Sequence, residues 1–320
     1  MYRYMIGAFV VLCILSLLIG SDPISWTGLL AGSDADWLTL KASRSPRLLA
    51  IILTGMGLSI SGVILQHIVR NKFVEPETAS GLDAAKLGIL VSLVLLPSVG
   101  VLSKMLVALV FCFVAGLIYI LIIARIRNQQ IVLIPVIGLM YGCVLSAGAE
   151  CYAYKNNLLQ NVQGWLLGDF SRVVQGYYEL LYVLIPVIVL SYVFAQRFTV
   201  AGMGQELATS LGVGYKSTVV LGLMLVSVTV AATVITVGSI PFIGLVIPNL
   251  VALKYGEHLA KTLPMVALGG ACLLLVCDIS GRLIIYPFEV PIVLLPVCWR
   301  YCLSAADFAG ASLMNRRFWL

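Results

Sequence analysis

Two arginines stand one helical turn apart where a long apolar segment begins. Arg44 and Arg47 precede a stretch rich in glycine and serine, and Arg282 lies far downstream at the end of another apolar stretch. A guanidinium group is a planar fork that pairs with a carboxylate through two parallel hydrogen bonds. Such a group of side chains would bind an acidic partner. The alternatives are lipid headgroups or an internal pair with Asp34 or Asp36.

A second motif is a short polar helix enclosed by glycines. The segment 202–214 reads GMGQELATSLGVG. Its Leu207 and Leu211 lie one turn apart on one face, and Gly212 and Gly214 are expected to end the helix. Such a helix suits docking in a groove of another protein; lying on the membrane surface is the alternative. The residues assigned to this docking are Glu206, Leu207, Ala208, Thr209, Ser210, Leu211 and Gly212.

The remaining reactive side chains do not form a catalytic or metal-binding pattern. Ser59 and Ser61 lie near glycines, as in an intramembrane hydrolase, but no histidine in another span could serve as their base. His258 lies in a charged loop, and His67 is far from it in sequence. The eight cysteines form no CxxC pair, and a GxxxxGK[ST] loop is absent. We therefore expect no catalytic residue, metal site or cofactor in this chain.

These motifs lie in a chain that must use lipid as its solvent. Hydrophobic residues make up 61% of the 320 residues and charged residues only 11%, too few for a soluble globular protein. A bilayer core about 30 Å thick is crossed by about 20 apolar residues per helix. Such runs of Leu, Ile and Val recur along the sequence, whereas the alternating strands of a membrane barrel do not. The sequence predicts an all-α, polytopic helical bundle.

Ten spans are predicted, and together they form a single transmembrane domain over residues 1–320. Their approximate ranges are 4–20, 47–67, 82–97, 101–124, 131–151, 178–195, 217–237, 241–254, 264–281 and 292–314. The first is interpreted as a span rather than a cleaved signal peptide, because its cleavage pattern is weak. An outer loop at 21–43 and an inner loop at 196–216 are too short to be domains.

The distribution of Lys and Arg predicts the orientation of the bundle. Loops and tails on one side hold Arg3, Arg70, Lys72, Arg125, Arg127, Arg197, Lys216, Lys254, Lys261, Arg316 and Arg317. Because cytoplasmic loops of membrane proteins carry an excess of Lys and Arg, this distribution places both termini in the cytoplasm. Arg44, Arg47 and Arg282 then fall outside, where a topogenic signal would not place them, so they need another role.

Small residues at four-residue spacing allow helices to approach closely. Gly138, Gly142 and Ser146 form such a row in the fifth span, and Gly55 and Ser59 do so in the second. For the fifth span, one interpretation is packing within the subunit. The other is that this face meets a partner subunit or lines a path.

A few ionisable residues fall within or near the spans. Asp83 and Lys86 are three residues apart on one helix face and are predicted to pair. Glu150, Asp278 and Glu289 lie near span ends. Contact with a substrate is one interpretation of these three, and snorkelling to water or capping of backbone groups is the other.

Taken in order, the motifs resemble the iron-siderophore and cobalamin permease family of ATP-driven importers. The matches begin with Arg44-Ser-Pro-Arg47 and the small-residue helix that leads to Arg70-Asn71. They continue with WLLG at 165–168, ATSLGV at 208–213, GSIPFIGLVIP at 238–248, DISGR at 278–282 and PFEVPI at 287–292. The resemblance covers about residues 40–292 and implies a type II ABC importer permease fold.

The resemblance also implies partners and roles. In the family, a soluble binding protein presents carboxylates to outer arginines, which match Arg44, Arg47 and Arg282, and the inner loop couples the permease to an ATPase. It implies a second permease subunit, two ATPase subunits that bind ATP and Mg²⁺, and a ferric siderophore as substrate, in the bacterial inner membrane. A secondary transporter or channel is the alternative, although few ionisable residues lie in the spans and the inner helix would have no role there.

One segment indicates whether the permease pairs with a copy of itself or with a different permease, and the last part of the chain departs from the family pattern. The run 71–88 is closer to permeases for catecholate siderophores, which pair with a distinct second permease, so a heterodimer is favoured over a homodimer. After residue 292 the family has a glycine-rich span, whereas this chain carries Arg300 and Asp307 two turns apart. A tenth helix with an internal ion pair and a tail read in an altered frame are the two hypotheses.

Overall fold

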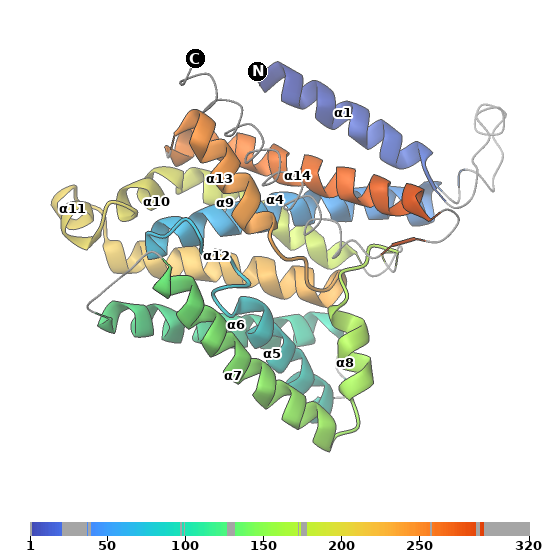
Figure 1. Ribbon diagram of the computed structural model, residues 1–320, viewed down its shortest axis with the longest axis horizontal. Coiled ribbons are helices and arrows are strands. Elements are labelled where there is room, and N and C mark those ends of the chain that lie inside the picture. Colours follow the sequence, from blue (N-terminus) through green and yellow to red (C-terminus); the bar gives the residue numbers. More distant parts are fainter. Residues whose placement is uncertain are drawn as a thin grey trace, which may run out of the picture.

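The structure is a computed structural model in which almost all regular elements are helices. It describes residues 2–20, 37, 40–96, 98, 100–126, 132–171, 173, 178–256, 258–285 and 289–290. Among these residues, β-pairing is confined to isolated bridge residues: a parallel bridge joins Leu167 and Ser239, and Ile285 is a further bridge residue. The helices lie alongside one another in a bundle (Figure 1). The predicted all-α class is therefore confirmed.

Nine of the ten predicted spans coincide with helices. The long helices are α4 (Ser45–Val69), α6 (Val101–Arg125), α7 (Leu133–Lys155), α12 (Tyr215–Thr236) and α14 (Leu259–Ile284). Shorter ones are α1 (Tyr2–Leu18), α5 (Gly81–Leu95), α9 (Leu184–Val193), which follows the 3₁₀ turn Glu179–Val183, and α13 (Ile243–Tyr255).

Fewer helices meet a strict criterion for crossing a membrane. Among the described residues five are long and apolar enough, or six if α9 and the bent helix α10 (Ala195–Ala201) count as one span. The tenth predicted range, 292–314, lies outside the described residues, together with Arg300 and Asp307. The count of about ten spans therefore stays a prediction.

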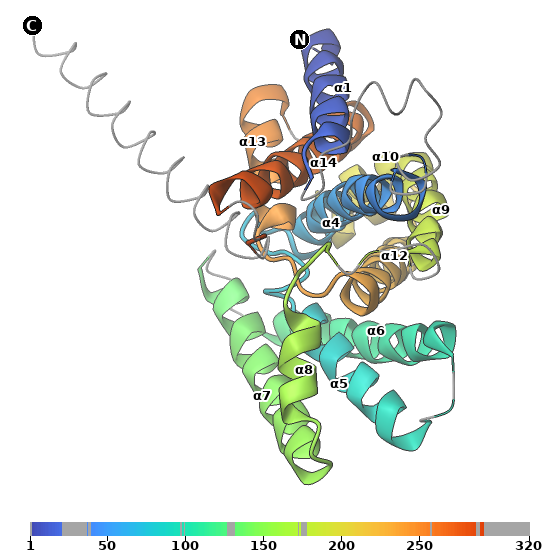
Figure 2. The same cartoon turned by 90° about the vertical axis from the view of Figure 1, so that its right-hand side faces the viewer.

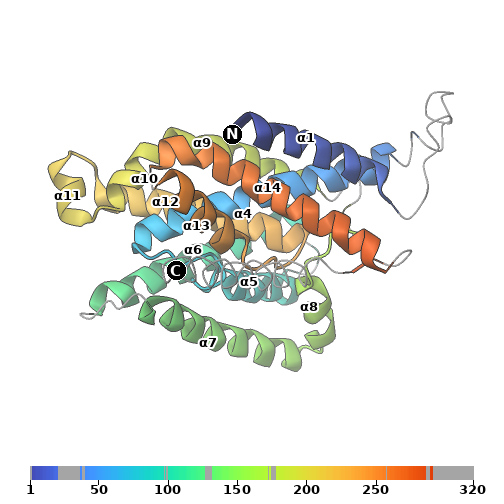
Figure 3. The ribbon, with the colours of Figure 1, turned by 45° about the horizontal axis from the view of Figure 1, so that its top comes forward.

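Helix α4 is the centre of the bundle. Viewed end-on, it lies between α14 and α12, while α5, α6 and α7 gather on the far side of α12 (Figure 2). Helix α14 runs along α4, with α1 packed on its other side (Figure 3). In the most apolar part of the α4 span 78% of the residues are buried, so this helix is enclosed by protein rather than by lipid.

Glycines set the distance between α4 and its neighbours. A Cβ atom added to Gly55 would lie 2.6 Å from the carbonyl oxygen of Gly270 in α14, and one added to Gly62 would overlap the carbonyl of Gly244 in α13. The Ser59 hydroxyl donates to the Gly55 carbonyl at 2.7 Å, within its own helix. The small-residue spacing predicted for this span thus lets three backbones pack in direct contact.

This packing predicts that two glycine-to-alanine changes differ strongly in their effect on the stability of the fold. We expect Gly62→Ala to destabilise the fold by about 1–3 kcal/mol, because its methyl group meets backbone that cannot rotate away. Gly7→Ala in α1, where a Cβ has no atom within 4 Å, is the control and should be neutral or slightly stabilising. Thermal unfolding of the purified protein in detergent measures both, and equal unfolding temperatures would contradict the close contact.

Candidate functional site

The three arginines that were predicted to lie outside come together at one end of the bundle. Arg44 ends the π-helical turn Leu40–Arg44, Arg47 lies in the first turn of α4, and Arg282 lies in the last turn of α14. Because α4 and α14 pack antiparallel, the start of one lies beside the end of the other. The structure thus brings together side chains that are more than two hundred residues apart in sequence.

An ion-pair network joins two of these arginines. Arg47 donates to Asp278 Oδ1 from Nη2 at 2.7 Å and from Nε at 3.1 Å, and to Glu289 Oε2 at 2.7 Å. Arg282 donates to the other oxygen of Asp278. The Asp278 side chain is fully buried, whereas that of Glu289 is 26% exposed. The network therefore has a buried centre and one partner within reach of solvent.

Arg44 and Arg282 also hold the end of α1. Arg44 Nη1 donates to the carbonyl oxygens of Leu17 and Leu18 at 2.6 and 3.1 Å, and Arg282 Nη1 donates to that of Ile19 at 2.7 Å. The last carbonyl groups of a helix lack partners within the helix, and cations are favourable there. Both arginines are buried, so each has a structural role in the single chain.

The predicted docking helix is a protrusion at the opposite end of the bundle. After α10, the chain forms α11 (Gln205–Ser210), which projects beyond the other helices (Figure 1). Leu207 and Leu211 are 55% and 62% exposed, while Ala208 is buried. The other exposed members of the predicted set are Glu206, Thr209, Ser210 and Gly212. Exposed leucines on a projecting helix are typical of a surface that binds another protein.

Gly212 ends α11 as expected, whereas Gly214 has a different role. Gly212 has φ +76°, and its N–H donates to the Thr209 carbonyl at 3.0 Å, while that of Val213 donates to the Ala208 carbonyl at 2.9 Å. This pair of bonds is a Schellman motif, which needs a left-handed residue at this position. Gly214 has φ −67° and precedes α12 as its N-cap, so it begins the next helix rather than ending this one.

The inner end of α4 contacts the base of this protrusion. Cβ atoms added to Gly202 and Gly204 would lie 2.9 Å from His67 Cδ2 and 3.0 Å from Arg70 Nη1. Gly204 also has φ +112°, which side chains rarely tolerate. The two glycines therefore let the segment before α11 lie directly against α4.

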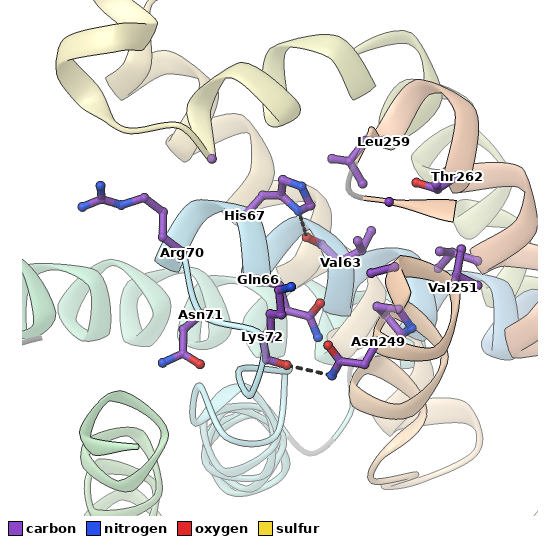
Figure 4. Close-up of a pocket in the computed structure, with 15 residues that line it drawn as sticks. Val63, Gln66, His67, Arg70, Asn71, Lys72, Asn249, Val251, Leu259 and Thr262 are labelled. Carbon is purple, nitrogen blue, oxygen red and sulfur yellow. Dashed lines mark hydrogen bonds between the residues drawn. The ribbon is translucent and has the colours of Figure 1, made fainter. Parts of the chain in front are cut away.

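A cavity of about 160 Å³ opens beside this contact. Figure 4 shows that its lining comes from the inner end of α4 and from α13 and α14, with His67 bonded to the Val63 carbonyl and Asn249 to that of Lys72. Arg70 points away from the labelled groups of α13 and α14, on the side of the protrusion.

Comparison with known proteins identifies the family. The sequence matches the FecCD transport family over residues 8–297. The chain belongs to this family. It is 59% identical over 288 residues to the ferric-anguibactin transport system permease protein FatD of Vibrio anguillarum, a match that covers 90% of this chain and 92% of that protein. It is 46% identical over 290 residues to the petrobactin import system permease protein YclN of Bacillus subtilis, covering 91% and 92% of the two chains.

The fold is also that of a known transporter class. A solved inward-facing ABC transporter of the metal-chelate type superposes with a TM-score of 0.77 over 98% of this chain and 100% of that chain, at 22% identity. The bundle therefore has the fold of an ABC importer permease. This FecCD chain is a multi-pass membrane protein, with the apolar helices that such a fold requires.

The small-residue row of α7 faces the inside of this FecCD subunit. Gly138 packs against a carbonyl group of the segment before α5, Gly142 against the Asp83 carboxylate, and Ser146 Oγ accepts a hydrogen bond from Lys86 at 3.0 Å. These contacts are the packing role considered from the sequence. The other face of α7 is exposed in the single chain, since only 22% of its apolar window is buried.

The predicted Asp83–Lys86 pair is not the contact that Lys86 makes, although the two charges still interact. Lys86 Nζ bonds Glu150 Oε1 at 2.8 Å instead of Asp83, its neighbour on the same helix. Glu77, in the segment between α4 and α5, lies near Asp83, and burial together with the Asp83 charge raises the pKa of its carboxyl to about 7. Three carboxyl groups and one lysine thus gather between α5 and α7.

The arginine network predicts different costs for its two carboxylates. Asp278→Asn leaves the buried Arg282 guanidinium without its ion-pair partner and leaves Arg47 with Glu289 alone, so we expect a loss of about 3–5 kcal/mol in unfolding free energy. Glu289→Gln removes a partly exposed partner of Arg47 alone and should cost about 1 kcal/mol or less. Denaturation in detergent compares the two variants, and a larger effect of Glu289→Gln would be inconsistent with Asp278 as the centre.

Proposed function

We propose that this chain is the permease subunit of a bacterial ATP-driven importer of ferric siderophores. The proposal is supported by its FecCD membership and by relatives named for ferric-anguibactin and petrobactin transport. The main observation in its favour is that the two ends of α4 take part in two different contacts. One end of this helix belongs to an arginine cluster, and the other end contacts the segment that precedes the projecting helix α11.

At the outer end, Arg44, Arg47 and Arg282 receive a soluble substrate-binding protein through its carboxylates. Arg47 is the member suited to direct contact, because its second partner, Glu289, is partly exposed and bound by a single pair of atoms. A carboxylate of the binding protein can replace Glu289 there without uncovering a buried charge. The other two arginines add positive potential that steers the acidic partner.

At the inner end, α11 docks in a groove of an ATPase subunit. Leu207 and Leu211 provide the apolar contact, and the glycine-containing segment before α11, which lies against the end of α4, passes its movement to the bundle. ATP and Mg²⁺ bind to the two ATPase subunits, and no group of three or more His, Cys, Asp or Glu side chains that could hold a metal ion occurs among the residues the structure describes. The coupling element corresponds to the inner loop 196–216.

The single domain of residues 1–320 pairs with a second permease, and the segment 71–88 favours a heterodimer. The exposed face of α7 is a candidate for the contact or for the path between the two subunits. Both termini lie in the cytoplasm, the outer loop 21–43 faces the binding protein, and the complex lies in the bacterial inner membrane.

Uptake by the reconstituted complex tests this function. The chain is assembled with its partner permease, ATPase and binding protein in proteoliposomes, and accumulation of radiolabelled ferric siderophore is followed with and without ATP. We expect ATP-dependent uptake that the double variant Leu207→Ser, Leu211→Ser reduces at least about tenfold, since exposed apolar anchors carry much of an interface's energy. The matched control, Leu207→Met with Leu211→Met, keeps the apolar contact and should retain most of the uptake. Absence of ATP-dependent uptake in the intact complex would refute the function.

Binding-protein association tests the outer surface separately. We expect Arg47→Glu to slow association about tenfold or more at low salt and to weaken its salt dependence, because steering by opposite charge is lost. Lys104→Glu, also on the outer side, makes the same change in net charge away from the cluster and is the control. Kinetics with the complex in lipid nanodiscs provide the measurement. If both variants associate equally fast, the arginine cluster is not the docking surface.

A further inference from the structure

The Arg47 guanidinium has two edges that can each bind a carboxylate, and the two edges are filled differently. Its Nε and Nη2 both donate to Oδ1 of the buried Asp278, at 3.1 and 2.7 Å. At the edge formed by Nη1 and Nη2, Glu289 Oε2 accepts a single bond, from Nη1 at 2.7 Å. An arginine carries five N–H donors. Both donors of one edge are therefore used by Asp278, whereas the other edge is held by a single oxygen.

Glu289 is the weaker of the two partners of Arg47. Its side chain is 26% exposed, whereas that of Asp278 is fully buried. Glu289 Oε1 makes no hydrogen bond within the described part of the chain. A carboxylate that accepts two parallel N–H bonds from arginine binds more strongly than one that accepts a single bond. A carboxylate that arrives from solvent can therefore form two bonds where Glu289 forms one.

The backbone next to Glu289 is attached to α14. The Val290 N–H donates to the carbonyl oxygen of Gly281 at 3.1 Å, in the last turn of that helix. Carbonyl groups at a helix end lack partners within the helix, so this bond satisfies one of them. The side chain of Glu289 reaches in the other direction, to Arg47 at the start of α4. Its position is thus fixed by α14, and only its side chain has to move to release Arg47.

We propose that Glu289 is an internal competitor of the binding protein: it occupies the open edge of Arg47 in the undocked permease and is displaced by a carboxylate of the docked partner. The inference rests on the proposed function and adds to it how docking at the same arginine cluster is regulated. Asp278 keeps its bonds throughout. Docking therefore exchanges one partly exposed carboxylate for another and leaves the buried ion pairs intact.

Such competition sets how long the partner stays bound. In the docked complex, the displaced Glu289 carboxylate lies close to the incoming one, and like charges repel each other. In the undocked permease, the same carboxylate stabilises Arg47. Both effects weaken docking, and the repulsion speeds dissociation. An importer that exchanges an emptied binding protein for a loaded one needs this release.

Replacing Glu289 by glutamine tests the competition. The assembled transporter is held in lipid nanodiscs, and its binding protein, loaded with ferric siderophore, is the probe. We expect Glu289→Gln to tighten binding about fivefold, the size expected when a partly exposed ion pair no longer competes, with slower dissociation. Damage to the fold would weaken binding instead. Glu289→Asp keeps the charge on a shorter side chain and should have an affinity between the two.

A matched control separates this competition from a change in net charge. Glu179→Gln removes an exposed carboxylate from the 3₁₀ turn before α9, on the predicted outer side and away from the arginine cluster. It should alter association slightly and only at low salt, because salt screens interactions between distant charges. The slower dissociation of Glu289→Gln should persist at high salt. Equal effects of the two variants would refute the competition.

A double-mutant cycle assigns the effect to Arg47. Arg47→Lys keeps a positive charge beside Asp278 but lacks the planar fork with its second edge. In this background, Glu289→Gln should change the affinity for the binding protein by less than about twofold, because the two side chains no longer interact as a pair. A fivefold gain in both backgrounds would overturn the proposal, since Glu289 would then act through another group.

The outcomes distinguish the competition from the function on which it rests. If ATP-dependent uptake occurs but Glu289→Gln does not tighten binding, the competition is refuted and the function stands. If binding tightens as expected but the complex imports no ferric siderophore, the function is refuted and the competition stands. If the unmodified complex binds no siderophore-loaded binding protein, both are refuted.

Discussion

Asp278 has no contact with solvent, and the protein has to satisfy its negative charge from within. Two guanidinium groups do so, one at the start of α4 and one a single turn further along α14. Removing a charge partner from such a site costs far more than forming a surface pair gains. The pairing fixes the register of α4 against α14, and Arg282 extends the contact to the end of α1. Three helices therefore share one outer anchor.

This anchor constrains how a partner can act at the outer surface. In the complex proposed above, a docking protein cannot take Asp278 from its arginines without exposing a buried charge, whereas it can compete for Arg47 at the partly exposed Glu289. From there α4 is held against α13 and α14 by backbone contacts at Gly62 and Gly55. Such contacts do not deform gradually, because glycine has no side chain that could yield. A displacement at one end of α4 is thus passed along it as a rigid body.

Local patterns in the sequence predicted the elements, whereas long-range partners needed the structure. Apolar runs located nine helices, and the glycine after Leu211 correctly ended α11, because both depend on residues within a few positions. The partners of Arg47 and Lys86 lie 231 and 64 residues away. From the sequence, Asp34 or Asp36, which lie outside the described residues, were only an alternative partner for the arginines, and Asp83, three positions from Lys86, was the predicted partner of that lysine. These pairings depend on how the helices pack: α4 lies antiparallel to α14, and α5 runs parallel to α7. The spacing of residues within one helix cannot predict contacts of this kind.

Two clusters in the bundle use the same kinds of side chain, and exposure distinguishes them. Both carboxylate oxygens of Asp278 accept hydrogen bonds from arginines, so neither is open to a ligand. This side chain holds the helices together. Glu150 has one buried cation behind it, and its side chain is 55% exposed on the side of α7 that also carries the exposed Tyr154. Solvent weakens an exposed ion pair. The Lys86–Glu150 pair is therefore expected to hold α5 against α7 less strongly than the Asp278 network holds α4 against α14.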